Sequence, residues 1–253
     1  MSKKIIVGNW KMNPQSLEEA KNIWNEIKKT ARKVSKVETV ICPPFVYLPV
    51  VSRQPSVVRL GAQDVFYGGS NDNKNADTGE ISTAMMKNLG VQYVIVGHSE
   101  RREKGETNEI INKKIKAALT TGFKVIFCVG EKERDHDGKY LHFIKHQINE
   151  GLKNIPKNMF KNLIVAYEPV WALSTHSKKA EEPENVLSMA IYIKKIIFSL
   201  NEIKEIKNIP VLYGGSVNGE NSGNLLKDGG IQGFLVGRNS LNPKEFKKII
   251  LSA

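Results

Sequence analysis

Eight short apolar runs recur through the sequence and constrain its fold more than any other feature. Most are rich in valine and isoleucine, and they are apolar at successive positions rather than at alternate ones. That pattern is typical of strands buried on both faces, as in a parallel sheet. The expected strands are Ile5–Val7, Thr39–Cys42, Val57–Leu60, Tyr93–Val96, Val125–Val129, Leu163–Ala166, Pro210–Tyr213 and Gly233–Val236.

Amphipathic segments lie between these runs and predict helices. In Glu109–Leu119 the large apolar residues fall on one side, and Gly122 follows as the expected helix stop. Glu184–Leu200 is a second long example. Strands that alternate with helices indicate an α/β fold, and eight such units in 253 residues favour a single closed (βα)8 barrel. No linker divides the chain, so we expect one catalytic domain over residues 1–253.

The charge of the chain leaves its partners open. There are 38 Lys and Arg against 26 Asp and Glu, a formal net charge of +12, but the lysines are scattered rather than gathered into a basic arm. Nucleic acid, a membrane surface or a phosphorylated metabolite would each fit that sign. We interpret the charge as a solvated, lysine-rich surface that attracts anions incidentally.

The cysteines and the N-terminus predict a cytoplasmic protein. Cys42 and Cys128 lie in expected strands and form no Cys-x-x-Cys motif, which indicates buried thiols in a reducing compartment. The first apolar run breaks at Gly8, so no signal-peptide core follows it. No apolar stretch is long enough to span a bilayer.

Polar and glycine-rich residues follow five of the expected strands. In a (βα)8 barrel the chemistry lies where the strands end and the next loops begin. We therefore expect one site at the mouth of the barrel, built from Asn9, Lys11, His98, Glu168, the Gly214-Gly215-Ser216 turn and Gly237.

Glu168 is the candidate base. Pro169 restricts Glu168 to extended geometry, so its side chain should leave the strand end in a defined direction. Apolar Val170 and Trp171 would partly desolvate the carboxylate and raise its basicity. The alternative is a surface glutamate at a strand end.

His98 and Lys11 are the candidates for a hydrogen-bond donor to a carbonyl and for a fixed positive charge. The residues after His98 resemble a helix start, where the helix dipole keeps an imidazole neutral and able to donate a hydrogen bond to a carbonyl. Lys11 would supply fixed positive charge at the mouth. A structural histidine and a solvated lysine are the alternatives for these two residues.

Two glycine-containing turns predict a phosphate site. Gly214-Gly215-Ser216-Val217 and Val236-Gly237-Arg238 follow the seventh and eighth strands, where this fold usually binds phosphate through backbone N–H groups. We expect no metal site, because His142 and His146, although spaced i, i+4, are not accompanied by a metal-ligand motif.

Five motifs together resemble the triosephosphate isomerase family, in its order and spacing and over essentially the whole chain. They are Gly8-Asn9-Trp10-Lys11-Met12-Asn13, Gly97-His98-Ser99-Glu100-Arg101-Arg102, Cys128-Val129-Gly130-Glu131, Ala166-Tyr167-Glu168-Pro169-Val170-Trp171-Ala172 and Tyr213-Gly214-Gly215-Ser216-Val217.

The resemblance implies a cofactor-free TIM barrel of glycolysis and gluconeogenesis that interconverts dihydroxyacetone phosphate and D-glyceraldehyde 3-phosphate through an enediolate. Glu168 would be the base and His98 the neutral electrophile, a pairing for which this family is a standard example. Lys11 and Asn9 would stabilise negative charge and contact substrate, and Glu100 would support them. The resemblance further implies phosphate binding by the N–H groups of Ser174, Ser216, Gly237 and Arg238, and a homodimer that uses a loop including Thr78, Gly79 and Glu80.

Three departures from the family pattern stand out. The lid reads Leu173-Ser174-Thr175-His176 where the family has Ile-Gly-Thr-Gly, and its run to Ala180 is one residue longer. Arg238 replaces a glycine. The stretch 102–106 is one residue shorter than usual and lacks an aromatic residue.

These departures leave two alternatives to an active isomerase. One is a catalytically weakened barrel that binds phosphometabolites beneath an altered lid, since loss of glycine makes positive φ angles costlier. The other is a secondary role in polyanion binding that uses the net positive charge.

Overall fold

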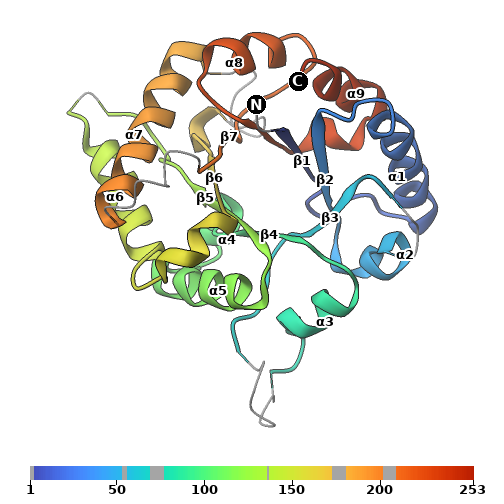
Figure 1. The fold of residues 1–253 in the computed structure, drawn as a ribbon, viewed down its shortest axis with the longest axis horizontal. Coiled ribbons are helices and arrows are strands. Elements are labelled where there is room, and N and C mark those ends of the chain that lie inside the picture. Colours follow the sequence, from blue (N-terminus) through green and yellow to red (C-terminus); the bar gives the residue numbers. More distant parts are fainter. Residues whose placement is uncertain (1–2, 53–55, 69–76, 136, 173–180, 202–208) are drawn as a thin grey trace.

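Eight parallel strands form the centre of the molecule. The computed structural model describes residues 3–52, 56–68, 77–135, 137–172, 181–201 and 209–253. The strands are β1 Lys4–Asn9, β2 Val37–Cys42, β3 Arg59–Ala62, β4 Tyr93–Val96, β5 Lys124–Val129, β6 Leu163–Tyr167, β7 Val211–Tyr213 and β8 Gly233–Val236. They pair in chain order, and β8 closes the ring against β1 (Figure 1). The predicted TIM barrel is confirmed.

Helices surround the barrel on its outer side (Figure 1). The α-helices are α1 Leu17–Ala31, α2 Leu48–Ser52, α3 Thr83–Asn88, α4 Ser99–Glu103, α5 Asn108–Thr121, α6 Lys139–Gly151, α7 Pro183–Asn201, α8 Ser222–Asp228 and α9 Pro243–Leu251. Short 3-10 turns are η1 Phe45–Tyr47, η2 Lys157–Asn162, η3 Val170–Ala172 and η5 Arg238–Leu241. Over the described ranges, no helix combines the length and the apolar character that a bilayer crossing requires.

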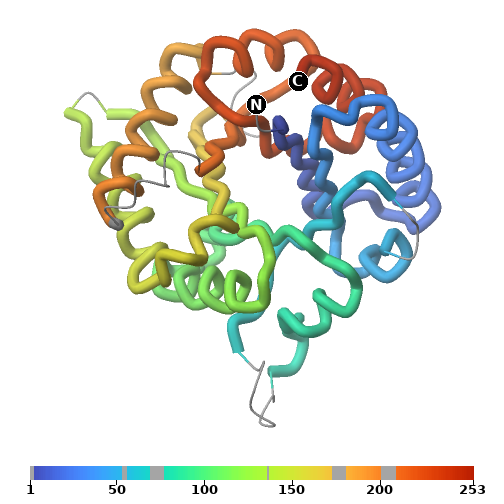
Figure 2. Tube along the Cα trace, viewed as in Figure 1, coloured from blue at the N-terminus to red at the C-terminus, as the bar shows by residue number. Residues whose placement is uncertain are grey.

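The chain runs once around the barrel, so its beginning and end lie side by side. Figure 2 follows this course from blue β1 to red α9. The register that joins the ends pairs Ile5 with Gly233 and Gly8 with Val236. The mouth therefore combines residues from both ends of the sequence.

Both long helices predicted from the sequence are present. Helix α5 covers the expected Glu109–Leu119, and its C-cap Gly122 has a left-handed φ of 90°, as predicted for a helix stop. Helix α7 covers the expected Glu184–Leu200. Thr107 caps the start of α5 by accepting the N–H of Ile110.

The third strand lies two residues later than predicted. The apolar run Val57–Leu60 suggested it, but Val57 is 52% exposed and the strand is Arg59–Ala62. Gly61 has no side chain and so does not contribute to an apolar pattern. Glycine is nevertheless required there, because a Cβ would lie only 2.4 Å from the Cys42 Sγ. Close packing, rather than hydrophobicity, selects the strand position here.

The core has two layers, which explains why the strands are apolar at successive positions. Alternate strand residues point into the barrel and form one buried cluster, which includes Ile5 and Val7 of β1 and Ile126 and Cys128 of β5. The intervening residues pack against the helices in a larger cluster. Cys42 and Cys128 are buried free thiols, as predicted, and burial raises the pKa of Cys42 far above its ordinary value.

The closing seam between β1 and β8 allows a direct test. Gly233 has φ 152°, and a Cβ there would lie 1.8 Å from the Ile5 carbonyl oxygen. We expect Gly233→Ala to lower the free energy of unfolding by about 1–3 kcal/mol, because the strands must move apart. The matched control is Gly223→Ala in α8, where a Cβ meets nothing within 4 Å. Urea titrations of both variants measure the difference, and equal stability would contradict this account of the seam.

Candidate active site

The mouth of the barrel brings the predicted catalytic pair together. His98 follows β4 by two residues, and Glu168 follows β6 directly. Their side chains meet with 3.3 Å between His98 Nε2 and Glu168 Oε1. Because β4 and β6 flank β5 in the ring, the carboxyl ends of the strands bring these two groups together on one side of the mouth.

Glu168 is buried, which contradicts the alternative of a surface carboxylate. Only 2% of the residue is exposed, and its Oε2 accepts a hydrogen bond from the Ser99 N–H at 3.2 Å. Gly214 leaves room for the side chain, because a Cβ there would lie 2.8 Å from Glu168 Cγ. The Cys128 thiol lies below, and burial, followed by the charge of Glu168, raises its pKa.

His98 sits at a helix N-terminus, as predicted. It is the N-cap of α4, and its Nδ1 accepts the N–H of Glu100 at 3.2 Å. A ring nitrogen that accepts a hydrogen bond carries no proton. The neutral ring therefore holds its proton on Nε2, the atom that faces Glu168 and the mouth.

Lys11 and Glu100 form an ion pair beside this imidazole. The distance from Lys11 Nζ to Glu100 Oε1 is 2.5 Å. Burial alone would raise the pKa of Glu100, but the hydrogen bond from Lys11 and the neighbouring positive charges outweigh it and hold the pKa below its ordinary value. Glu100 is therefore an anion that fixes the ammonium group of Lys11.

The backbone around Lys11 is held in an uncommon conformation. Lys11 has φ 53°, and its N–H donates to Asn9 Oδ1 at 3.0 Å. The amide of Gln63 donates to the carbonyl oxygens of Lys11 and Cys42, both at 2.8 Å. Such strain persists only where neighbours enforce it, and it is typical of functional sites.

The residues predicted to bind phosphate differ in their hydrogen bonding and exposure, and one of them lies outside the described part of the chain. The Ser216 N–H and hydroxyl both donate to the Ala172 carbonyl, at 3.1 and 2.9 Å. Gly237 directly follows β8 next to Lys11, and Arg238 begins η5 with an exposed side chain. Ser174 and the rest of the altered lid, Leu173, Thr175 and His176, lie outside the described residues.

Arg102 supports the turn that carries His98, although the stretch 102–106 departs from the family pattern. Its guanidinium donates to the Gly97 carbonyl at 2.8 Å, to Asn108 Oδ1 at 2.7 Å and to the Cys128 carbonyl at 3.2 Å. These bonds join the ends of β4 and β5 to the start of α5.

A charge cluster with two acidic and two basic side chains packs behind the same turn. Lys114 of α5 is 4% exposed and lies 2.7 Å from Asp64 and 2.5 Å from Glu106. Arg101 of α4 pairs with both carboxylates as well. Burial raises the pKa of Asp64, while Lys114 and Arg101 act against that shift. The cluster anchors α4, and with it His98 and Glu100.

A second network holds the two described flanks of residues 173–180. Glu131 Oε1 accepts the Tyr167 hydroxyl at 2.8 Å and the Trp171 indole N–H at 3.1 Å. Arg134 lies between them and Glu181, 3.2 Å from Glu181 Oε2. The end of β6, η3 and the start of α7 are thereby joined.

Thr78, Gly79 and Glu80, the predicted dimer residues, do not join the mouth. All three are exposed, Gly79 has φ 90°, and Glu80 donates to the Asp77 carbonyl at 3.2 Å. They precede α3 in the chain.

Two residues of the site escaped the sequence reasoning. Gln63 directly follows β3, so a polar residue after a strand could have revealed it, but the misplaced third strand concealed that position. Ser99 contributes a backbone N–H, which leaves no signal in the residue type. For metals, the described residues hold no group of three or more suitable His, Cys, Asp or Glu side chains.

The closed barrel defines the class of (βα)8 enzymes, and its mouth holds a buried carboxylate beside an imidazole and a paired ammonium group. A family model described as triosephosphate isomerase matches residues 4–253. The chain therefore belongs to the triosephosphate isomerase family.

Full-length relatives support the same assignment. The triosephosphate isomerase of Dictyoglomus thermophilum is 42% identical over 257 residues, which cover 100% of both chains. That of Aquifex aeolicus is 40% identical over 99% of both chains. That of Natranaerobius thermophilus is 39% identical over 99% of this chain and 96% of its own.

The buried charge cluster behind His98 yields a stability prediction. Lys114→Met leaves Asp64 and Glu106 with one cation fewer, so we expect a loss of about 3–5 kcal/mol in the free energy of unfolding. The matched control is Lys113→Met, which removes an exposed lysine paired with Glu109 at 2.7 Å and should cost far less, because solvent screens an exposed ion pair. Urea unfolding at one fixed protein concentration compares them, and similar losses would refute a structural role for the cluster.

Proposed function

We propose that Glu168 is the base with which this isomerase interconverts dihydroxyacetone phosphate and D-glyceraldehyde 3-phosphate. The proposal rests chiefly on the 3.3 Å between Glu168 Oε1 and His98 Nε2, within a mouth that also holds Lys11. When a base and a proton donor lie this close together, the base can remove a proton from one atom of a small substrate while the donor binds the adjacent atom.

In the proposed reaction, Glu168 removes the proton from the substrate carbon next to the carbonyl group. His98 donates from Nε2 to the carbonyl oxygen, and an enediolate forms. The ammonium group of Lys11 and the amide of Asn9 stabilise the developing negative charge. The hydroxyl proton on the first carbon then passes through His98 to the former carbonyl oxygen, since His98 gives its Nε2 proton to one oxygen and takes a proton from the other. Glu168 returns its proton to the former carbonyl carbon, which completes the isomerisation. Glu100 acts through Lys11, whose position it fixes.

Phosphate binding is proposed at the ends of β7 and β8. The N–H groups of Ser216, Gly237 and Arg238, with that of Ser174, would hold the phosphate. Turnover then requires two exchanges: the Ser216 N–H must leave the Ala172 carbonyl, and the Glu168 carboxylate must leave the Ser99 N–H. The structure is consistent with a state that precedes substrate binding.

Glu168 can be tested in a coupled assay that starts from glyceraldehyde 3-phosphate. We expect Glu168→Gln to lower kcat by about 10²–10⁴-fold, because the base is lost. Glu168→Asp should lower kcat by about 10²-fold, because the carboxylate is misplaced by one methylene group. The exposed Glu220→Gln should leave kcat unchanged.

Negligible turnover of the wild-type protein would favour the weakened phosphometabolite-binding barrel instead. Normal kcat in Glu168→Asp would refute the role of Glu168. A secondary polyanion role would require DNA binding that weakens steeply with salt, and no binding at low salt would remove it.

We further propose a homodimer formed by the loops after β1, β2 and β3. Apolar side chains are unusually exposed there, with Met12 at 85% and Val46 at 74%. The first two of these loops contact each other, because the Tyr47 hydroxyl donates to the Pro14 carbonyl at 2.8 Å. Exposed apolar groups of this kind mark interaction surfaces, and the exposed loop Thr78–Glu80 would reach toward the partner.

Mass measurement in solution tests the dimer. We expect Val46→Glu to dissociate it at micromolar concentration, because the substitution places a charge in an apolar interface. Ile191→Glu makes the same change on the outer face of α7, where Ile191 is 58% exposed, and should leave the mass unchanged. A monomeric wild-type protein, or an unaffected Val46→Glu dimer, in sedimentation equilibrium would refute this interface.

We also propose a cytoplasmic location and a single domain over residues 1–253. The two free, buried thiols support the first, since free thiols suit a reducing compartment. Closure of the ring by β8 against β1 supports the second, because neither end of the chain completes a core without the other.

A further inference from the structure

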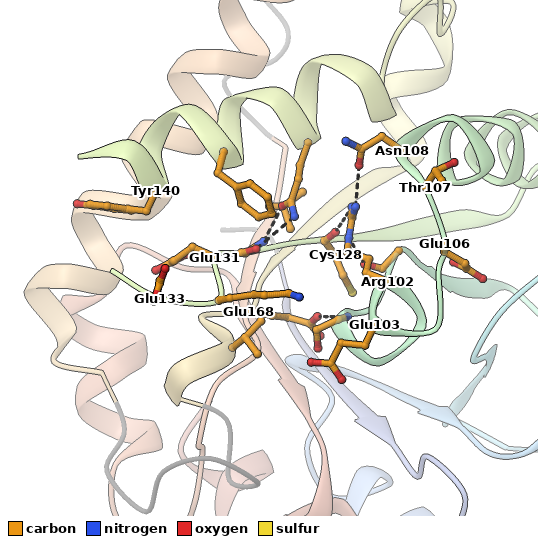
Figure 3. A pocket seen from close by; sticks show the side chains of 18 of the residues that line it. Arg102, Glu103, Glu106, Thr107, Asn108, Cys128, Glu131, Glu133, Tyr140 and Glu168 are labelled. Carbon is orange, nitrogen blue, oxygen red and sulfur yellow. Dashed lines mark hydrogen bonds between the residues drawn. The ribbon is translucent and has the colours of Figure 1, made fainter. Parts of the chain in front are cut away.

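A cavity of about 630 Å³ lies on the outer side of Glu168, away from the substrate mouth. Its wall runs from the turn after β4, over the end of β5, to the first turns of α6 (Figure 3). It shares Glu168 and Ser99 with the mouth. Among the described residues, however, its lining includes neither Lys11 nor His98, so it is a separate space.

Acidic residues outnumber basic ones in the lining of this outer cavity, which is the opposite of the whole chain. The chain as a whole carries a formal charge of +12. Three basic residues line the cavity, namely Arg102, Lys132 and Lys139, and they face a larger number of acidic ones. The acidic residues are Glu103, Glu106, Glu131, Glu133, Asp135 and Glu168. Glu106 is already paired with Lys114 and Arg101, and Glu131 with Arg134, so the rim carboxylates of Glu103 and Glu133 carry the excess that a ligand would meet.

Three residues of the lining also carry buried oxygen atoms that lack a hydrogen-bond partner in the described part of the chain. These atoms are Ser99 Oγ, Glu106 Oε2 and Glu131 Oε2. A buried acceptor without a donor is unfavourable, so each is better satisfied when a donor is nearby. The two carboxylate oxygens only accept, so the groups that they lack are donors, whereas the Ser99 hydroxyl can donate or accept.

The outer end of the cavity is apolar and open. Tyr140 and Phe143 of α6 line it, together with Val129 and Val170. Phe143 is 45% exposed, so its ring is available to a ligand that enters from solvent. Flat apolar groups pack favourably on such rings, and cations are attracted to their faces.

We propose that the outer cavity binds a small organic cation with a flat apolar body, such as an aromatic amidine or amine, and that this ligand restrains Glu168. The apolar body packs on Tyr140 and Phe143, and the cationic group donates to the carboxylates. Ser99 N–H already holds Glu168 Oε2 at 3.2 Å on this side. A cation in the cavity adds a second attraction, so the carboxylate is kept from the substrate carbon.

This geometry predicts inhibition that substrate does not overcome. The ligand and the triose phosphate occupy different spaces, so both can be bound at once. Inhibition therefore lowers kcat rather than raising KM. This part of the inference rests on the proposed role of Glu168 as the base, whereas binding to the cavity does not depend on it.

The test uses benzamidine as the probe, with benzamide and benzoate as uncharged and anionic controls of the same shape. Calorimetry on the wild-type protein should give benzamidine an affinity at least about ten-fold higher than that of benzamide, since charge-assisted hydrogen bonds to carboxylates are the stronger ones. Benzoate should not bind. In the isomerase assay, benzamidine should lower kcat at saturating substrate.

Two variants locate the site. Glu103→Gln and Glu133→Gln each remove a carboxylate from the rim and should weaken benzamidine about three- to ten-fold, with kcat in the absence of ligand unchanged. Glu109→Gln removes an exposed carboxylate from neighbouring α5, outside the cavity, and should bind benzamidine as the wild type does. Unfolding curves confirm that the variants are folded.

Several results would overturn the proposal. Equal binding of benzamidine and benzamide would remove the role of charge. Purely competitive inhibition, or equal weakening by Glu109→Gln, would place the ligand elsewhere. Binding that weakens in the rim variants but leaves kcat unaffected would establish the cavity and refute its coupling to Glu168.

Discussion

The pairing of β8 with β1 is the constraint on which the rest of the structure depends. A parallel sheet that closes on itself has no edges, and all its strands end on one rim. The register of the seam therefore fixes where Asn9 and Gly237 meet, although they lie near opposite ends of the chain. The same closure sets His98 and Glu168 on opposite sides of β5. The mouth owes its composition to this geometry, because no two of these residues are close in sequence.

Buried charge keeps that mouth rigid. The carboxylates and cations behind α4 balance one another, so ion pairs support the helix that follows His98. Burying such groups is costly unless every partner is present. The complete set of ion pairs defines the orientation of α4, the helix that orients the imidazole of His98. Arg102 adds support through uncharged acceptors, since its three bonds end on the turn after β4, on β5 and on the first residue of α5.

Much of this arrangement could be predicted from the sequence, for identifiable reasons. Successive apolar residues revealed strands buried on both faces, and polar or glycine-rich residues after five of the strands revealed the mouth. Glu168, His98 and Lys11 lie at such positions. Contacts made by the backbone, or between residues distant in sequence, left no such pattern: Ser99 acts through its N–H, and Lys114 resembles the many solvated lysines. Gln63 was missed because Gly61 interrupts the apolar signal of β3.

The bonds from Ser216 to the Ala172 carbonyl have a consequence for how tightly the site retains any anion. In the proposed phosphate site, the anion would compete with an internal acceptor for the same N–H, so that N–H would contribute only the difference between two hydrogen bonds. The internal acceptor also offers the N–H a partner as the anion leaves. When the product leaves, the Ser216 N–H would therefore not lose its hydrogen-bond partner, because it returns to the Ala172 carbonyl. An internal acceptor of this kind favours rapid release of the anion over tight binding.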